Sequence, residues 1–251
     1  MDIKEIQNLV KDHINIKDDE IDQIPKEISY GNFLLLGGQL HSKRYQITDN
    51  VNNDGYRSDE FKGDNGFLFL GCSFTFGFGL EEYESWPWIV GKHFNVKVWN
   101  ASVFREGDDV CFINAIKWIP KLKPKVVCMM IPPPGRHKFF DYDKKIDKEF
   151  YGWTLPKEPK FPWLFNSKHL YLSTLKNIMG IKLICDEFDI PFIVKSCDTH
   201  SFQGTLKGYW ENFKRRIYLS DDDKARDGSH PGSKWHQKMA DDYIKEIEKC
   251  I

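Results

Sequence analysis

Residues 66–79 read Gly-Phe-Leu-Phe-Leu-Gly-Cys-Ser-Phe-Thr-Phe-Gly-Phe-Gly. The apolar run Phe67–Leu70 has no polar alternation, which is typical of a strand covered on both faces. Glycines at 71 and 77 let the backbone turn tightly directly after this strand. The stretch therefore predicts a buried strand that runs into a short turn and presents Ser73 at its end.

Strands and helices alternate along the rest of the chain. Apolar runs predict further strands at 96–101, 126–131 and 191–196, and helical spacing predicts helices at 83–93, 108–119, 170–188 and 233–250. This alternation predicts an α/β fold, a three-layer α/β/α sandwich with a central parallel sheet. Ligands of such sheets bind beyond the carboxyl ends of the strands, where Ser73 falls.

The sequence makes four further predictions about these helices. Pro120 is expected to end the helix that starts at Asp108, and Ser233 to cap the last helix. The inward face of the 170–188 helix is expected to hold the apolar residues Leu172, Leu175, Ile178, Met179 and Leu183. In the last helix, the inward residues are expected to be Ala240, Tyr243, Ile244 and Ile247.

Composition excludes several classes of function. The chain has 251 residues, 41% of them hydrophobic, and its 36 Lys and Arg balance 37 Asp and Glu, so net charge favours no nucleic-acid partner. No apolar run reaches the roughly 20 residues that span a bilayer, and the N-terminus lacks a secretion signal, so we expect a cytoplasmic protein. The six cysteines, at no zinc-like spacing, are expected to be buried free thiols, and no cofactor or metal is expected.

The chain divides into two predicted parts. Residues 1–62 are expected to form an N-terminal extension packed on a main domain, residues 63–251. The extension includes a turn-rich stretch at 49–58, Asp-Asn-Val-Asn-Asn-Asp-Gly-Tyr-Arg-Ser.

A second chemical motif lies at residues 226–232, Arg-Asp-Gly-Ser-His-Pro-Gly. Nucleophilic acyl transfer needs a nucleophile, a base and a carboxylate that orients the base, and Ser73, His230 and Asp227 are the three candidates. Each motif alone also fits an ordinary capped turn or a solvent loop. Cys72 is the weaker candidate nucleophile, because its side chain is expected to point away from that of Ser73.

In this order the two motifs resemble the SGNH (GDSL-type) hydrolase family. Its first block is a strand ending Gly-Asp-Ser-x-Thr-x-Gly, with Cys72 in place of the Asp here, and its last block is Asp-x-x-His near the C-terminus. Residues 52–57, Asn-Asn-Asp-Gly-Tyr-Arg, resemble an Asn-x-x-Gly-Phe/Tyr-Arg segment of many bacterial and phage members. The resemblance covers roughly residues 50–250 and implies a flavodoxin-like fold.

The resemblance also implies a serine esterase that acts through an acyl-enzyme at Ser73. Amides of Ser73 and Gly107 would form the oxyanion hole, since the stretch from Asn100 to Gly107 is similar to the second block. The third block, Gly-x-Asn-Asp, is absent, and residues 130–137 read Met-Ile-Pro-Pro-Pro-Gly-Arg-His. Either Arg136 or His137 replaces the missing Asn, or the protein is a slow or inactive relative; an Arg near this point in some phage members favours Arg136.

Nine aromatic residues between 138 and 168 are expected to overhang the site. Such an insertion either contacts substrate or packs its own aromatics for stability. We assign substrate contacts to Asn100, Arg105, Trp153 and Trp163, and expect a small-molecule or glycan ester, with small O-acyl or acetyl groups on a carbohydrate favoured.

Three alternatives stay open. A degenerate scaffold could serve as a glycan- or protein-binding module, which the missing Asn and Cys72 favour. A lipase or thioesterase would need a wide apolar groove beneath residues 138–168. An acyltransferase would pass the acyl group to a sugar hydroxyl in place of water.

Overall fold

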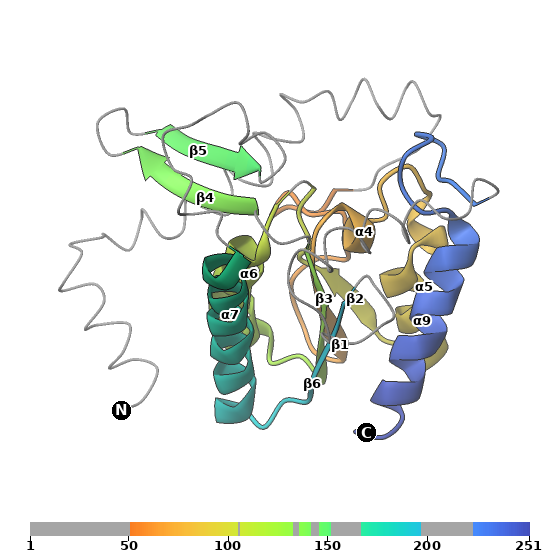
Figure 1. The fold of residues 1–251 in the computed structure, drawn as a ribbon. Coiled ribbons are helices and arrows are strands. Elements are labelled where there is room, and N and C mark those ends of the chain that lie inside the picture. Colours follow the sequence, from red (N-terminus) through yellow and green to blue (C-terminus); the bar gives the residue numbers. More distant parts are fainter. Residues whose placement is uncertain (1–50, 105, 133–135, 142–145, 152–166, 197–222) are drawn as a thin grey trace.

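The computed structural model describes residues 51–104, 106–132, 136–141, 146–151, 167–196 and 223–251. Four parallel strands form one sheet in the order β2 (Lys97–Asn100), β1 (Gly66–Leu70), β3 (Val126–Ile131) and β6 (Phe192–Ser196). One face is covered by α6 (Asp108–Leu122) and α7 (Ser167–Glu187), and the other by α5 (Trp86–Phe94) and α9 (Ser233–Ile247) (Figure 1). This three-layer α/β/α arrangement confirms the predicted fold class.

Strand β1 lies inside the sheet and is buried on both faces, as its unbroken apolar run predicted. Leu68 and Leu70 pack in the cluster beneath α6 and α7. Phe67 and Phe69 pack in the cluster beneath α5 and α9. Successive side chains of a strand point to opposite faces, so one apolar run supplies both cores.

Helix α7 buries a different side from the one expected. Leu172, Met179 and Leu183 are 55%, 57% and 66% exposed, whereas Ile181 and Cys185 are fully buried. The prediction was wrong for these three residues because the helix is apolar on two sides, and their helical spacing does not show which side meets α6. For α9 the prediction holds, since Ala240, Tyr243 and Ile247 are buried and Ile244 packs against them.

Two helix ends also differ from expectation. Helix α6 continues through Pro120 to Leu122, so the helix tolerates the one backbone hydrogen bond that the proline cannot donate. The N-cap of α9 is Gly232, without a side-chain cap of its own. The carboxylate of Asp223 accepts from the amides of Lys234 at 3.2 Å and Trp235 at 2.8 Å and so replaces the expected Ser233 cap.

The segment after β3, which includes the start of the predicted aromatic insertion, contains an antiparallel pair of strands. β4 (Arg136–Asp141) pairs with β5 (Ile146–Tyr151), with Arg136 opposite Tyr151. Charged residues interrupt the apolar alternation of both strands, which hid them in the sequence. The pair lies near the end of the sheet where α4 (Ser73–Phe76) is found (Figure 1).

Residues 57–59 lie along the outer edge of β2. The Ser58 hydroxyl donates to the Val98 carbonyl and accepts from the Asn100 amide, both at 2.8 Å. Asp59 donates its amide to the Val98 carbonyl at 3.1 Å and accepts from the Val98 amide at 2.8 Å through its carboxylate. The backbone groups that an edge strand would leave open are therefore occupied.

Free thiols of Cys72, Cys111, Cys128 and Cys185 are buried, as expected, and burial raises the pKa of Cys185 to about 12. Cys250 is exposed, contrary to expectation, and Cys197 lies outside the described residues. Within the described ranges, no helix combines the length and apolar character needed to cross a bilayer.

A buried histidine joins α5 to α9. The Trp86 amide donates to Nδ1 of His236 at 3.1 Å, and His236 is 1% exposed. Trp86 also stacks on Tyr243 with ring centroids 4.3 Å apart. Burial, with smaller effects from the charges of His230 and Arg57, lowers the pKa of His236 to about 3, so the imidazole is neutral in the folded protein.

We predict that His236 makes the fold sensitive to acid. Below about pH 6.5 the unfolded chain protonates this histidine while the folded protein does not, so stability falls between about pH 6.5 and pH 3. His236→Asn keeps an acceptor for the Trp86 amide and removes the titration. Urea unfolding should show the wild type losing about 2 kcal/mol more than the variant between pH 7.5 and pH 5. Equal losses in both proteins would contradict this assignment.

Candidate active site

Ser73 is the first residue of α4 and follows β1 after two residues. It is 2% exposed. A side chain on Gly71 would overlap Oγ1 of Thr75, so only glycine fits at the start of this turn. The Cys72 side chain belongs to the core cluster beneath α5 and α9, which favours Ser73 over Cys72 as the candidate nucleophile.

Asp227 and His230 are held together in one short loop. An isolated bridge between Lys224 and Pro231 closes this loop, and the Ala225 amide donates to the His230 carbonyl at 2.9 Å. Nδ1 of His230 lies 2.5 Å from Oδ2 of Asp227. The carboxylate thus fixes the direction of the imidazole and leaves Nε2 as the nitrogen that can exchange a proton with another group.

The Asp227 carboxylate is ionised at neutral pH. Its side chain is only 4% exposed, and burial by itself raises its pKa. Hydrogen bonds from His230 and Ser229, together with the electrostatic attraction of His230, outweigh burial and hold the pKa of Asp227 well below the usual range. Ser229 contributes through its hydroxyl, 2.5 Å from Oδ2, and its amide, 3.2 Å from Oδ1.

The serine turn and the histidine loop pack against each other. The Arg226 amide donates to the Gly79 carbonyl at 3.0 Å, although the two residues are 147 positions apart. The His230 ring lies 5.6 Å from the ring of Phe74, the residue next to Ser73, and 5.0 Å from that of Phe78. The structure therefore brings the two predicted motifs to one place.

A surface ion pair links the same two segments. Arg226 Nη1 lies 2.6 Å from Oε2 of Glu84, in the short 3₁₀ helix η1 (Glu82–Glu84), and Nη2 lies 3.3 Å from Oε1. Burial raises the pKa of Glu84, but the hydrogen bond and charge of Arg226 outweigh it and lower the pKa overall. Sequence reasoning gave Arg226 no role.

The loop after β2 runs beside the serine turn. The Ala101 amide donates to the Phe69 carbonyl at 2.9 Å and the Val103 amide to the Gly71 carbonyl at 3.2 Å. Further along, Gly107 is the buried N-cap of α6. This path brings the loop that carries the candidate oxyanion glycine alongside Gly71.

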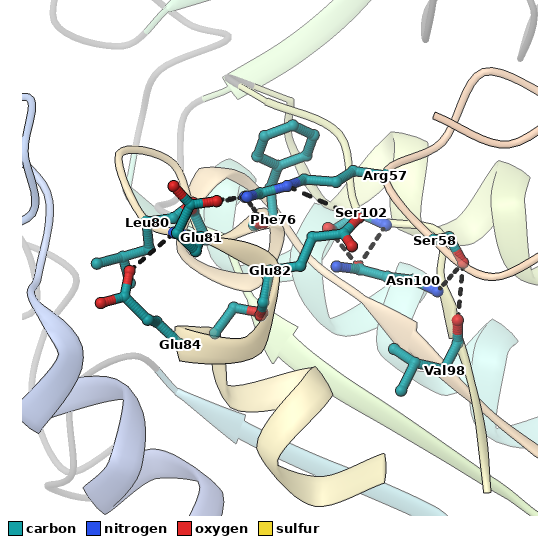
Figure 2. A network of polar contacts seen from close by, with 12 residues as sticks. Arg57, Ser58, Phe76, Leu80, Glu81, Glu82, Glu84, Val98, Asn100 and Ser102 are labelled. Atoms are coloured by element: carbon teal, nitrogen blue, oxygen red, sulfur yellow. Dashed lines mark hydrogen bonds and ion pairs between the residues drawn. The ribbon is translucent and has the colours of Figure 1, made fainter. Parts of the chain in front are cut away.

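Asn100, assigned a substrate contact from the sequence, lies beneath the turn with 1% of its surface exposed (Figure 2). Nδ2 donates to the Thr75 carbonyl at 3.3 Å, and Oδ1 accepts from the amide and hydroxyl of Ser102 at 3.2 Å and 2.5 Å. These contacts connect the end of β2 to α4.

The structure does not describe the side chains of the other predicted site residues. Arg105, Trp153 and Trp163 lie outside the described residues, and Arg136 is described by backbone alone, as the first residue of β4. In the described part of the chain, no three His, Cys, Asp or Glu side chains gather in a way that could hold a metal ion.

No family model matches the chain, and no curated protein matches it. Among solved structures, it is similar to a G-D-S-L family lipolytic protein from Desulfitobacterium hafniense DCB-2, at 14% identity over 72% of this chain and 99% of that one, with a TM-score of 0.44. It is also similar to the psychrotrophic esterase EstA from Pseudoalteromonas sp., at 14% identity over 74% and 98%, with a TM-score of 0.46. A third is a catalytic mutant of Axe2, an acetylxylan esterase from Geobacillus stearothermophilus, at 15% identity over 74% and 95%, with a TM-score of 0.45. These likenesses are distant, and the function proposed below rests on this chain's own residues.

Substitution of two glycines with left-handed backbone, Gly79 and Gly228, can test whether the serine turn packs against the histidine loop. A Cβ on Gly79 (φ +81°) would lie 2.9 Å from Ala225 Cβ and 3.1 Å from Asp227 Oδ1, whereas one on Gly228 (φ +72°) would meet nothing within 4 Å. Gly228→Ala should cost only backbone strain, about 1–2 kcal/mol. We predict that Gly79→Ala lowers the urea-unfolding free energy further, because it also pushes on the loop of Asp227. Equal losses would show that Gly79 and this loop are not in close contact.

Proposed function

We propose that this protein is a serine esterase of the SGNH type, with Ser73 as nucleophile, His230 as general base and Asp227 as the residue that orients the base. One observation carries the proposal. The imidazole, held by a buried carboxylate at 2.5 Å, packs against the residue that directly follows a serine at the end of a central strand.

The chemistry follows from these roles. Ser73 Oγ attacks the ester carbonyl while Nε2 of His230 accepts its proton, and the ionised Asp227 stabilises the imidazolium that forms. Collapse of the tetrahedral intermediate expels the alcohol, which takes the proton back from His230, and leaves an acyl group on Ser73. Water, activated by the same histidine, then hydrolyses this acyl-enzyme.

For the oxyanion we propose the amides of Ser73 and Gly107, with Arg136 in place of the absent Asn. A missing oxyanion donor typically costs about 10²–10³ in rate, so a replacement matters. Arg136 begins β4 shortly after β3 ends, which is the position in the chain where the family's Asn would fall.

For the substrate we propose small O-acyl groups, on a carbohydrate, with Arg105, Trp153 and Trp163 as contacts. Asn100 takes a different role from the one expected. Because its amide is buried and bonded to Thr75 and Ser102, we propose that it supports the serine turn.

The decisive test is intact mass after exposure to a fluorophosphonate, which needs no knowledge of the substrate. We expect one adduct on the wild type and none on Ser73→Ala. Ser229→Ala should keep the adduct, because the Ser229 hydroxyl faces Asp227 and Nδ1, the side of the imidazole away from Nε2. With an activated ester such as p-nitrophenyl acetate, Asp227→Asn should lower kcat on the order of 10⁴-fold.

Two results would overturn the proposal. Full esterase activity in Ser73→Ala would exclude the mechanism. A folded wild type without an adduct would favour the binding-module alternative, to which the missing Asn and Cys72 already point.

A further inference from the structure

Arg57 is buried, and its guanidinium points toward the turn that carries Phe76 and Leu80 (Figure 2). Nη1 donates to the carbonyl oxygens of Phe76 at 3.2 Å and Gly77 at 3.0 Å, and Nη2 donates to that of Leu80 at 2.6 Å. The side chain is only 2% exposed. One guanidinium therefore holds three backbone carbonyls of a single turn.

The surroundings of Arg57 explain how a cation is tolerated there. Nε lies 4.0 Å from Oε1 of Glu82, and Cζ lies 5.4 Å from the centre of the Phe76 ring. Carbonyl dipoles, a carboxylate and an aromatic face together offset the lost hydration of the charge. A lysine would bring the charge but not the rigid planar fork of donors.

The three carbonyls lie on both sides of Phe78 and Gly79. On the serine side, the amides of Gly77 and Phe78 donate to the Ser73 carbonyl at 3.0 Å and 3.1 Å. On the histidine side, the Phe78 ring contacts His230 and the Gly79 carbonyl accepts from the Arg226 amide at 3.0 Å. The segment that Arg57 fixes is thus the one that joins the two halves of the site.

We propose that Arg57 is a positioning residue that sets the placement of His230 relative to Ser73 by holding the 76–80 turn. The proposal rests on the proposed esterase function. Arg57 acts through the turn, so its loss should lower kcat and leave KM nearly unchanged. A displacement of about 1 Å in a reacting pair can cost about 10²-fold in rate.

A neighbouring residue provides a matched control. Tyr56 belongs to the same segment and is equally buried, at 2% exposed, but its hydroxyl donates to Asn114 of α6 at 2.9 Å, away from the turn. Tyr56→Phe therefore weakens the attachment of the segment without releasing the 76–80 carbonyls.

The experiment compares wild type, Arg57→Lys, Tyr56→Phe and Glu82→Gln at equal fractions of folded protein, determined by urea unfolding. The readouts are the second-order rate of fluorophosphonate labelling at Ser73, and kcat and KM for p-nitrophenyl acetate. We expect Arg57→Lys to lower the labelling rate and kcat by about tenfold to a hundredfold, with KM within about twofold. Tyr56→Phe should stay within about twofold of wild type in both rates, since no atom of the turn loses a partner.

Each outcome decides the proposal. The positioning role would be overturned by wild-type rates in Arg57→Lys, or by a loss of rate in Tyr56→Phe as large as that in Arg57→Lys. In both cases, labelling of the wild type would still support the esterase function. An unlabelled wild type would overturn the esterase and the positioning role together. If Arg57→Lys does not fold, Arg57→Gln, which keeps two N–H donors without the charge, takes its place under the same criteria. Glu82→Gln leaves the three bonds to the carbonyls in place, so it is a second control that should stay within about twofold of wild type.

Discussion

Burial of β1 on both faces is the constraint from which the rest of the structure follows. A strand with phenylalanines on one face and leucines on the other needs a helical layer on each side. Its neighbours β2 and β3 occupy both edges, so its backbone is saturated as well. The chain can therefore change direction only at the strand's end, and Ser73 stands at that point.

The parts of the candidate site are held together mainly by hydrogen bonds to backbone carbonyls. Arg57 and Arg226 approach the same region from opposite ends of the sequence, and both donate to carbonyls of residues 76–80. Their charges are balanced within one short element, since Glu82 lies near Arg57 and Glu84 pairs with Arg226. Helix η1 thus takes part in two ion pairs. The pair with Arg57 is buried, and the pair with Arg226 lies at the surface. The buried pair is the less screened by salt.

The sequence predicted those features of the fold and of the candidate site that depend on residues close together in the chain. The four sheet strands, the serine turn and the pairing of Asp227 with His230 over three residues all depend on near neighbours, and the structure has them together. Hydrogen bonds to backbone carbonyls could not be predicted, because every residue has a carbonyl and no residue type marks the one that accepts. The three carbonyls that Arg57 contacts are an example. The Asp223 cap of α9 lies 11 and 12 residues before the amides that it accepts from, outside the spacing of a local cap. The buried side of α7 depends on α6, a separate helix that the pattern of α7 does not contain. Cys72, the residue before Ser73, is a core residue beneath α5 and α9.

The place of α9 bears on how the chain acquires its fold during synthesis. This helix shares a core cluster with Phe67 and Phe69 of β1 and with Trp86 of α5. Its first residue, Ser233, follows Trp86 by 147 positions and Phe67 by 166. Until α9 emerges from the ribosome, only α5 can cover this face in a nascent chain, and the part that α9 would bury stays exposed. Exposed apolar surface of this kind favours aggregation. The same delay applies to the histidine loop, which directly precedes α9. Completion of the candidate site therefore awaits the same late segment of the chain that covers the core, since residues 223–232 directly precede α9.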